Sequence, residues 1–215
     1  MIVIIQCAAT KRPHAGQFRT SSGQLIKFVA DPSAAPPSNC LYARPDDASD
    51  EGPSWRQLLL QYNGRAGENP FGLLQALDLY ENPAYGRLAD KFGIENTYIL
   101  SAGWGLIAGS FLTPDYDITF SQSADGYKRR RRSDFYRDLC MLPLGTSDPI
   151  FFFGGKDYVP LFATLTKSIS APKTVFYNSA VPPDAPGCSL KRFETSTRTN
   201  WHYECASAFI DGRVE

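Results

Sequence analysis

Four short apolar segments, each followed at once by small and polar residues, constrain the fold of this chain more than any other feature. They cover residues 1–5, 98–100, 149–153 and 173–177. Continuous β-branched and aromatic runs of this length are typical of strands buried on both faces. Helices are predicted between them at roughly 72–92, 127–141 and 157–169. The alternation predicts an α/β fold, a three-layer sandwich with a mostly parallel central sheet of about four core strands.

Parallel strands that are neighbours in a sheet end at the same edge, so the residues that follow the four segments are expected to meet there. Open α/β sheets bind ligands in the crevice outside the carboxyl ends of their strands. The small residues at these positions let a ligand approach the backbone, although tight turns require small residues as well. The candidate substrate-binding residues at the strand ends are Gln6, Cys7, Lys11, Ser101, Trp104, Gly154, Lys156, Tyr158 and Asn178.

Several of these side chains suit recognition of a planar polar ligand. The amides of Gln6 and Asn178 each offer a donor and an acceptor, as reading the edge of a base requires. Trp104, predicted to be exposed, or Tyr158 would stack on its face. The structural alternatives are that Gln6 caps a backbone edge and that Asn178 is an ordinary turn residue.

Two carboxylates follow the second strand in the sequence Pro114-Asp-Tyr-Asp117. A carboxylate in a crevice can act as a general base or stabilise a developing positive charge. Asp115 and Asp117 are therefore the candidate catalytic residues. The alternative is a tight turn beside a core tryptophan, with both aspartates solvated.

A run of five cations concentrates positive charge at one place in a chain whose 22 basic and 22 acidic residues cancel. Arginine matches phosphate with two parallel hydrogen bonds, so the run favours binding to a nucleic-acid backbone. Lys11 and Lys156 would hold further phosphates. A solvated helix start, balanced by nearby aspartates, is the alternative. The run consists of Lys128, Arg129, Arg130, Arg131 and Arg132.

The length of 215 residues fits a single domain spanning 1–215, with an inserted hairpin and proline-rich arm at about 14–70. The insertion either covers the strand-end crevice as a flap or decorates the far side. Ser54 reads as the N-cap of a helix, and a last helix is predicted at roughly 199–210, capped by Thr199 or Asn200.

Composition excludes some classes of function. No apolar stretch reaches 18 residues, and Met1 leads directly into a core strand, so we expect a cytoplasmic protein without a membrane partner. Five scattered cysteines, no Cys-x-x-Cys pair and two histidines make a metal site improbable. We expect no cofactor, and no obligate protein partner is evident.

Three of the strand-end motifs resemble a known family. Cys7-Ala-Ala-Thr-Lys11 is similar to the Cys-Ser-x-x-Lys signature of uncharacterised bacterial and archaeal domains, which are distant relatives of the bacterial peroxide-stress proteins. The run 101–107 resembles the family's Ser-Ala-Lys-Tyr-Gly-Leu-Leu turn, and 114–117 resembles its Pro-Tyr-Asp. Gly154-Gly155 with Tyr158 is similar to its third-strand element.

The resemblance covers about two thirds of the chain, outside the insertion, and the motifs also depart from the family pattern. Ala8 stands where serine is usual, Gly103 replaces the lysine, and Asp115 is an extra residue. The change at Gly103 removes a cation, which implies a ligand different from that of the relatives.

The resemblance implies a uracil-DNA-glycosylase-like layout and DNA as the partner. Bacterial phage-defence glycosylases, which remove glucosylated hydroxymethylcytosine from viral DNA, fall in the same broad group. The resemblance therefore implies a DNA glycosylase that hydrolyses the N-glycosidic bond of a modified base flipped out of the stack. In this interpretation Asp117 is the main catalytic carboxylate and Asp115 the alternative.

No lysine is placed convincingly for Schiff-base chemistry by the sequence, so a monofunctional hydrolase that leaves an abasic site is expected. Two other functions compete with this interpretation. One is a non-catalytic DNA-binding stress protein that uses the same crevice. The other is a nucleosidase acting on free nucleosides, which would not need the run of cations.

Overall fold

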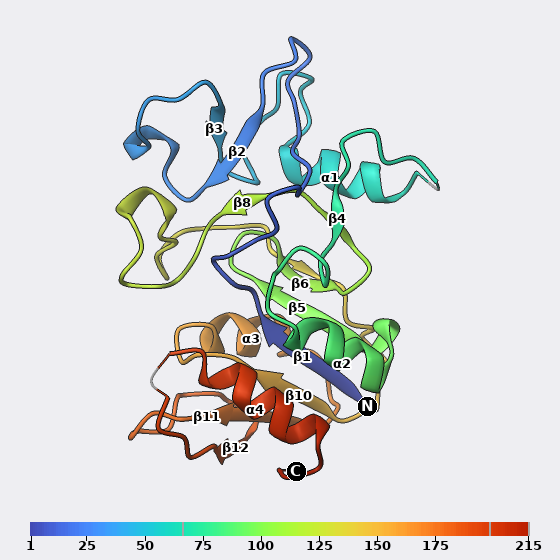
Figure 1. Ribbon diagram of the computed structural model, residues 1–215, viewed down its shortest axis with the longest axis vertical. Coiled ribbons are helices and arrows are strands. Elements are labelled where there is room, and N and C mark those ends of the chain that lie inside the picture. Colours follow the sequence, from blue (N-terminus) through green and yellow to red (C-terminus); the bar gives the residue numbers. More distant parts are fainter. Residues whose placement is uncertain (66, 198, 215) are drawn as a thin grey trace.

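A central sheet organises the molecule in the computed structural model, which describes residues 1–65, 67–197 and 199–214 (Figure 1). Its seven strands are β1 (Ile2–Gln6), β5 (Thr97–Ser101), β6 (Gly105–Ala108), β9 (Leu139–Cys140), β10 (Ile150–Phe153), β11 (Lys173–Tyr177) and β12 (Ser189–Arg192). They lie side by side in the order β12-β11-β10-β1-β5-β6-β9. The fold is α/β, as predicted.

The four predicted core strands are neighbours in this sheet. β1 pairs in parallel with β5 on one side and with β10 on the other, and β10 pairs in parallel with β11. Val3, Ile4 and Ile5 in β1 are fully buried, as expected of a strand covered on both faces. The carboxyl ends of the four strands therefore meet at one edge, as the sequence predicts.

The sheet is larger than the predicted four strands, because β6, β9 and β12 extend it. β6 runs antiparallel to β5 after the tight turn at 102–104, and β9 pairs in parallel with β6. β12 adds to the opposite side and its residues are exposed. β9 has two residues and β12 is exposed, so neither carries the apolar run that marks a buried strand. β6 is apolar and largely buried, but it follows β5 after only three residues and was not predicted as a separate strand.

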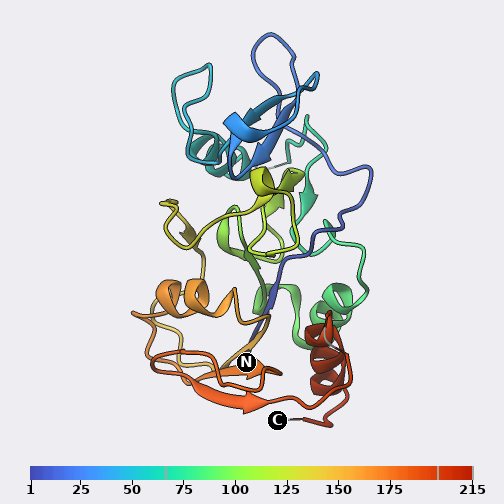
Figure 2. The same cartoon turned by 90° about the vertical axis from the view of Figure 1, so that its left-hand side faces the viewer.

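Helices flank the sheet on both faces (Figure 2). α2 (Ala84–Phe92) and α4 (Trp201–Ile210) pack against each other on one face, and α3 (Val159–Leu165) lies on the other. α4 confirms the predicted last helix, with Asn200 at its N-cap. α3 is shorter than predicted.

Two helix predictions need correction. The predicted helix at 72–92 is confined to α2, because β4 (Leu74–Gln75) pairs instead with β7 (Leu112–Thr113). The predicted helix at 127–141 is wrong, since the segment holds a 3-10 turn, Gly126–Lys128, then irregular backbone and β9. Arg130 there pairs with Asp138 at 2.6 Å. A straight helix would separate these residues by about 12 Å along its axis.

A second region of the chain lies beyond the carboxyl edge of the main sheet (Figure 1). It contains a small parallel sheet of β3 (Leu41–Ala43), β2 (Ile26–Val29) and β8 (Tyr116–Asp117), together with α1 (Trp55–Asn63). The predicted hairpin forms here, as Thr20 N–H donates to Gln24 O at 2.9 Å. Ser54 caps α1 in a reciprocal capping box with Gln57, confirming the predicted helix start.

The inserted segment shares its hydrophobic core with the rest of the molecule. Phe28 in β2 and Trp55 in α1 belong to the same cluster of buried side chains as the central strands. Phe28 packs edge-on against Trp104 with ring centroids 5.0 Å apart. Residues 14–70 therefore cover the turn after β5, rather than decorating the far side of the sheet.

Gly105→Ala should destabilise the protein by about 2 kcal/mol or more, because φ is +92° there and a Cβ would meet the Leu139 carbonyl oxygen at 2.4 Å. Gly86→Ala is the matched control, since its Cβ would meet nothing within 4 Å on helix α2. We expect that control to gain about 0.5–1 kcal/mol. Urea unfolding of both variants measures the difference, and equal shifts would contradict the close β6–β9 contact.

Candidate functional site

A cleft of about 770 Å³ lies at the carboxyl ends of β1 and β10. It is bounded on one side by the start of helix α4 and on another by residues that follow β8. Its described lining consists largely of uncharged hydrogen-bonding side chains, with the carboxylates of Glu81 and Asp157, and includes no lysine or arginine among those residues. The polar residues among them are Gln6, Thr10, Glu81, Asn82, Thr119, Ser121, Gln122, Ser123, Asp157, Tyr158, Thr199, Asn200, His202 and Tyr203.

Three of the predicted binding residues meet in this cleft. Gln6 accepts a hydrogen bond from Gly155 N–H through Oε1 at 2.6 Å, so the amide holds the two strand ends together and presents its NH₂ group. The Cys7 Sγ lies 3.3 Å from the Tyr158 hydroxyl. Burial raises the pKa of Tyr158 well above its usual value, so its hydroxyl remains protonated at neutral pH.

The two candidate carboxylates lie in an adjoining hollow of about 440 Å³, here called the carboxylate hollow. Asp117 pairs with Lys27 at 3.6 Å and with Lys128 at 3.2 Å. Asp115 has no ion pair within the described chain and accepts one weak hydrogen bond from Gln17 Nε2 at 3.4 Å. The two aspartates are two residues apart, yet their electrostatic surroundings differ sharply.

Lys11 lies in the same hollow. Its Nζ is 4.4 Å from the centroid of the Tyr116 ring and donates to Ala9 O at 3.3 Å. Desolvation lowers the pKa of Lys11 below its usual value, opposed by the nearby Cys7, Asp115 and Asp117. Lys11 is therefore an amine held close to two carboxylates without a direct ion pair among the described residues.

The cationic run lines a third hollow, of about 450 Å³, here called the arginine hollow. Arg131 and Arg132 are exposed and Arg129 is half-buried, so these three can reach a phosphate backbone. Arg130 cannot, because it is 7% exposed and donates to both oxygens of Asp138 and to Ala102 O. Arg130 is therefore held inside the protein and is not placed to contact DNA. Lys128 is half-buried and pairs with Asp117 and Asp125, and its contact with a phosphate stays a prediction.

Trp104 also requires correction. The indole is fully buried against Phe28, Tyr116 and the Arg56 guanidinium, which lies 5.5 Å from the ring centroid. It offers no exposed face for stacking. The inserted segment supplies Phe28 and Arg56, so local sequence around the turn could not reveal this burial.

The turn at 102–104 is fixed by two buried arginine–aspartate pairs, whose carboxylates are Asp46 and Asp138. Arg130 donates to the carbonyl of Ala102, while Arg56 donates to those of Gly103 and Trp104. Asp138 and Asp46 bind the two guanidinium groups bidentately. All three carbonyls of the turn therefore have charged donors.

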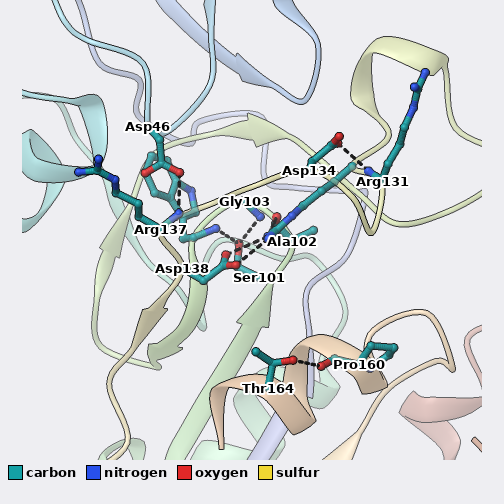
Figure 3. Close-up of polar contacts among 12 residues, drawn as sticks. Asp46, Ser101, Ala102, Gly103, Arg131, Asp134, Arg137, Asp138, Pro160 and Thr164 are labelled. Carbon is teal, nitrogen blue, oxygen red and sulfur yellow. Dashed lines mark hydrogen bonds and ion pairs between the residues drawn. The ribbon is translucent and has the colours of Figure 1, made fainter. Parts of the chain in front are cut away.

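Ser101 has a structural role in the same turn. Its Oγ accepts a hydrogen bond from Gly103 N–H at 3.2 Å (Figure 3). It also accepts one from Trp104 N–H at 3.1 Å and donates to the Tyr116 hydroxyl at 2.8 Å. The residue is fully buried. The structure therefore places Ser101 behind the cleft and not on its wall.

The remaining predicted residues lie outside the central cleft. Gly154 is buried, and a Cβ there would meet the Phe152 ring at 2.3 Å, so glycine is required for packing. Asn178 Nδ2 donates to Thr197 O at 3.5 Å, as expected of a turn residue. Lys156 is exposed in a fourth hollow of about 930 Å³, beside Arg132 and Lys167.

The four hollows adjoin one another. Ala9 and Thr10 border both the central cleft and the carboxylate hollow. Gln122 and Asp157 border both the cleft and the arginine hollow, and Arg132 borders the arginine hollow and the fourth. Together they form one groove along the carboxyl edge of the sheet, with a polar centre and with lysines and arginines toward both ends.

Sequence reasoning left His202 out of the site. The side chain is 5% exposed, lines the central cleft, and its Nε2 has no hydrogen-bond partner among the described residues. Asn200 beside it has φ = 63°, the one positive φ of a non-glycine residue in the described chain. In the sequence, the signal for His202 and Asn200 is the polar pair Thr199–Asn200 just before a buried helix. That pair by itself predicts only a helix cap.

Comparisons with protein-family models, curated proteins and solved structures found no match for this chain. No described helix has the length and apolar character needed to cross a membrane. Within the same described residues, no group of three or more His, Cys, Asp or Glu side chains is placed to hold a metal ion. Interpretation of the site therefore depends on its own geometry.

Arg56→Met should lower the free energy of unfolding by about 3–5 kcal/mol, because it leaves Asp46 and two turn carbonyls without their buried donor. Arg87→Met is the control, since the Arg87–Asp211 pair is exposed and its loss should change stability little. Urea unfolding measures both variants. Equal small shifts would contradict the role of Arg56 in holding the turn.

His202 should make folding stability depend on pH, because burial lowers its pKa from 6.5 to about 4 in the folded protein. Between these values the unfolded chain binds the extra proton, so the contribution is complete above pH 6.5 and is lost as the pH falls toward 4. The expected slope is about 1.4 kcal/mol per pH unit. His202→Phe should flatten it in urea unfolding experiments, whereas His14→Gln, at an exposed position, should not. An unchanged slope in His202→Phe would contradict this assignment.

Proposed function

We propose that this protein is a DNA glycosylase that hydrolyses the N-glycosidic bond of a modified base and leaves an abasic site. The observation that carries the proposal is the continuous groove, in which a polar cleft lies between the carboxylate hollow and the arginine hollow. A flipped-out nucleotide needs a base pocket, a carboxylate near the sugar and cations along the strand. The parallel sheet with its site at the carboxyl edge is compatible with a uracil-DNA-glycosylase-like layout.

The chemistry of the central cleft favours an uncharged, strongly polar base. Amides, hydroxyls and the Tyr158 and Tyr203 rings line it, and its described lining residues include no lysine or arginine that would select a phosphate. Side chains with both donors and acceptors suit hydroxyl-bearing ligands. A sugar-bearing base, such as the glucosylated hydroxymethylcytosine of phage DNA, is the substrate class that we propose, with a cytoplasmic role in antiviral defence.

The surroundings of the two carboxylates favour Asp115 as the group that stabilises the oxocarbenium-like transition state. Asp117 faces the Lys27 and Lys128 ammonium groups, which offset part of its field. Asp115 has no such pair among the described residues and lies in the same hollow. We therefore assign the main catalytic role to Asp115, and to Asp117 the role of holding the two lysines beside the strand.

The cations of the groove suit a strand more than a free nucleoside. Arg129, Arg131 and Arg132 are accessible in the arginine hollow, and Lys156 extends the series into the fourth hollow. A nucleosidase would gain nothing from them. A non-catalytic binder would lose affinity through the carboxylates that border the same path.

The test is release of the base from DNAs that carry ordinary, uracil-containing, hydroxymethylated or glucosylated cytosines, with alkali to reveal abasic sites. Asp115→Asn should lower kcat by about 10²–10³-fold, because the carboxylate acts mainly on the transition state, while DNA affinity persists or rises. Asp117→Asn should have the smaller effect. Asp90→Asn, on the exposed face of α2, is the matched control and should leave kcat unchanged.

Other results would redirect the assignment. Intact DNA throughout, with a salt-sensitive gel shift, would identify a binding protein. Release of bases from free nucleosides but not from DNA would identify a nucleosidase. Base release that survives both asparagine variants would overturn the role of the carboxylates.

A further inference from the structure

The groove contains one amine whose environment differs from that of every other lysine beside the candidate carboxylates. Lys27 and Lys128 both pair with Asp117. Hydrogen bonding to Asp125, and then attraction to Asp117, raises the pKa of Lys128 above its usual value. This keeps the Lys128 amine protonated and unreactive as a nucleophile.

Lys11 lacks such a pair among the described residues. Its Nζ donates to a backbone carbonyl, that of Ala9, and lies over the face of Tyr116. Desolvation is the largest effect on the Lys11 pKa and lowers it, which increases the fraction of neutral amine at neutral pH. A partly desolvated lysine is the usual form of the amine that attacks a carbonyl carbon.

The backbone holds this amine in place. Lys11 forms a β-bridge with Tyr80, and Arg12 N–H donates to Leu79 O at 2.9 Å. The Tyr116 ring below the amine is itself fixed, because its hydroxyl bonds to Tyr80 at 2.7 Å and to Ser101 at 2.8 Å. Lys11 is therefore positioned on a rigid, buried support and opens into the carboxylate hollow.

We propose that the Lys11 amine attacks the abasic sugar and makes the protein an abasic-site lyase, a second activity that rests on the proposed glycosylase function. The Nζ lone pair adds to the C1′ aldehyde of the ring-opened sugar, and loss of water gives a protonated imine. Asp115 removes a proton from C2′. The electron pair of the C2′–H bond forms an enamine. The enamine then restores the protonated imine as the C2′=C3′ double bond forms, and the 3′ phosphate leaves with the electrons of the C3′–O bond.

Hydrolysis completes the reaction and balances it. The water released when the imine forms is matched by the water that cleaves the conjugated imine, which returns Lys11 as the free amine. The products are a strand ending in an unsaturated aldehyde and a strand with a 5′ phosphate. No oxidant, reductant or metal is needed. This departs from the monofunctional hydrolase expected from the sequence, in which the position of Lys11 relative to the carboxylates was not visible.

The experiment uses the full chain and a DNA oligonucleotide with a preformed abasic site, so that it does not depend on which base is excised. Sodium borohydride reduces an imine to a stable amine and therefore traps the covalent complex. We expect wild-type protein to be trapped, and Lys11→Arg, which keeps the charge, to lower the trapped yield by about tenfold or more. Lys91→Arg, on the exposed surface of α2, should be trapped as well as wild type.

Mapping of the trapped peptide in wild-type protein keeps the test decisive if Lys11→Arg fails to fold. Attachment at Lys11 supports the proposal. Attachment at another lysine, equal trapping of folded Lys11→Arg, or no trapping of folded wild type would overturn it. Base release from modified DNA is scored separately by alkali, so a glycosylase without lyase activity is distinguished from a protein that is not a glycosylase.

Discussion

The turn between β5 and β6 depends on two buried arginine–aspartate pairs, and the functional edge of the molecule depends on that turn. Arg56 and Arg130 donate hydrogen bonds to the three carbonyls of residues 102–104, which would otherwise be buried without these charged donors. Each guanidinium is held bidentately, so its position is defined as well as its charge. The amides of the same turn bind Ser101 and Cys7, which links it directly to the end of β1.

This arrangement joins the inserted segment to the site. Arg56 comes from α1 and Phe28 from β2, and both contact Trp104. The insertion thereby makes Trp104 part of the core. Lys27, also in the insertion, borders the carboxylate hollow. Stability of the insertion and shape of the groove are therefore coupled, since a change in α1 removes donors from the turn that supports the cleft.

The groove distributes charge unevenly along its length. Its centre is polar and, among the described residues, lacks lysine and arginine, while exposed arginines lie on one side and a mixed set of lysines and aspartates on the other. Among these lysines and aspartates, Asp117 forms ion pairs with two ammonium groups. Asp115 and Lys11 have none of the described charged groups within ion-pair distance. An unpaired carboxylate and an unpaired amine in one hollow are the groups most available to a substrate.

The sequence by itself determined the α/β class and the four parallel core strands, because continuous apolar runs such as Ile2–Ile5 encode burial on both faces locally. It also brought Gln6, Cys7 and Tyr158 together, since parallel neighbours end at one edge. Only the tertiary structure decided which side chains on that edge are free. Trp104 is buried by Arg56 and Phe28, which lie 48 and 76 residues before it in the sequence, and Arg130 pairs with Asp138 across an irregular loop. No local sequence pattern encodes such contacts. The same holds for His202, which enters the cleft only because α4 packs beside α2.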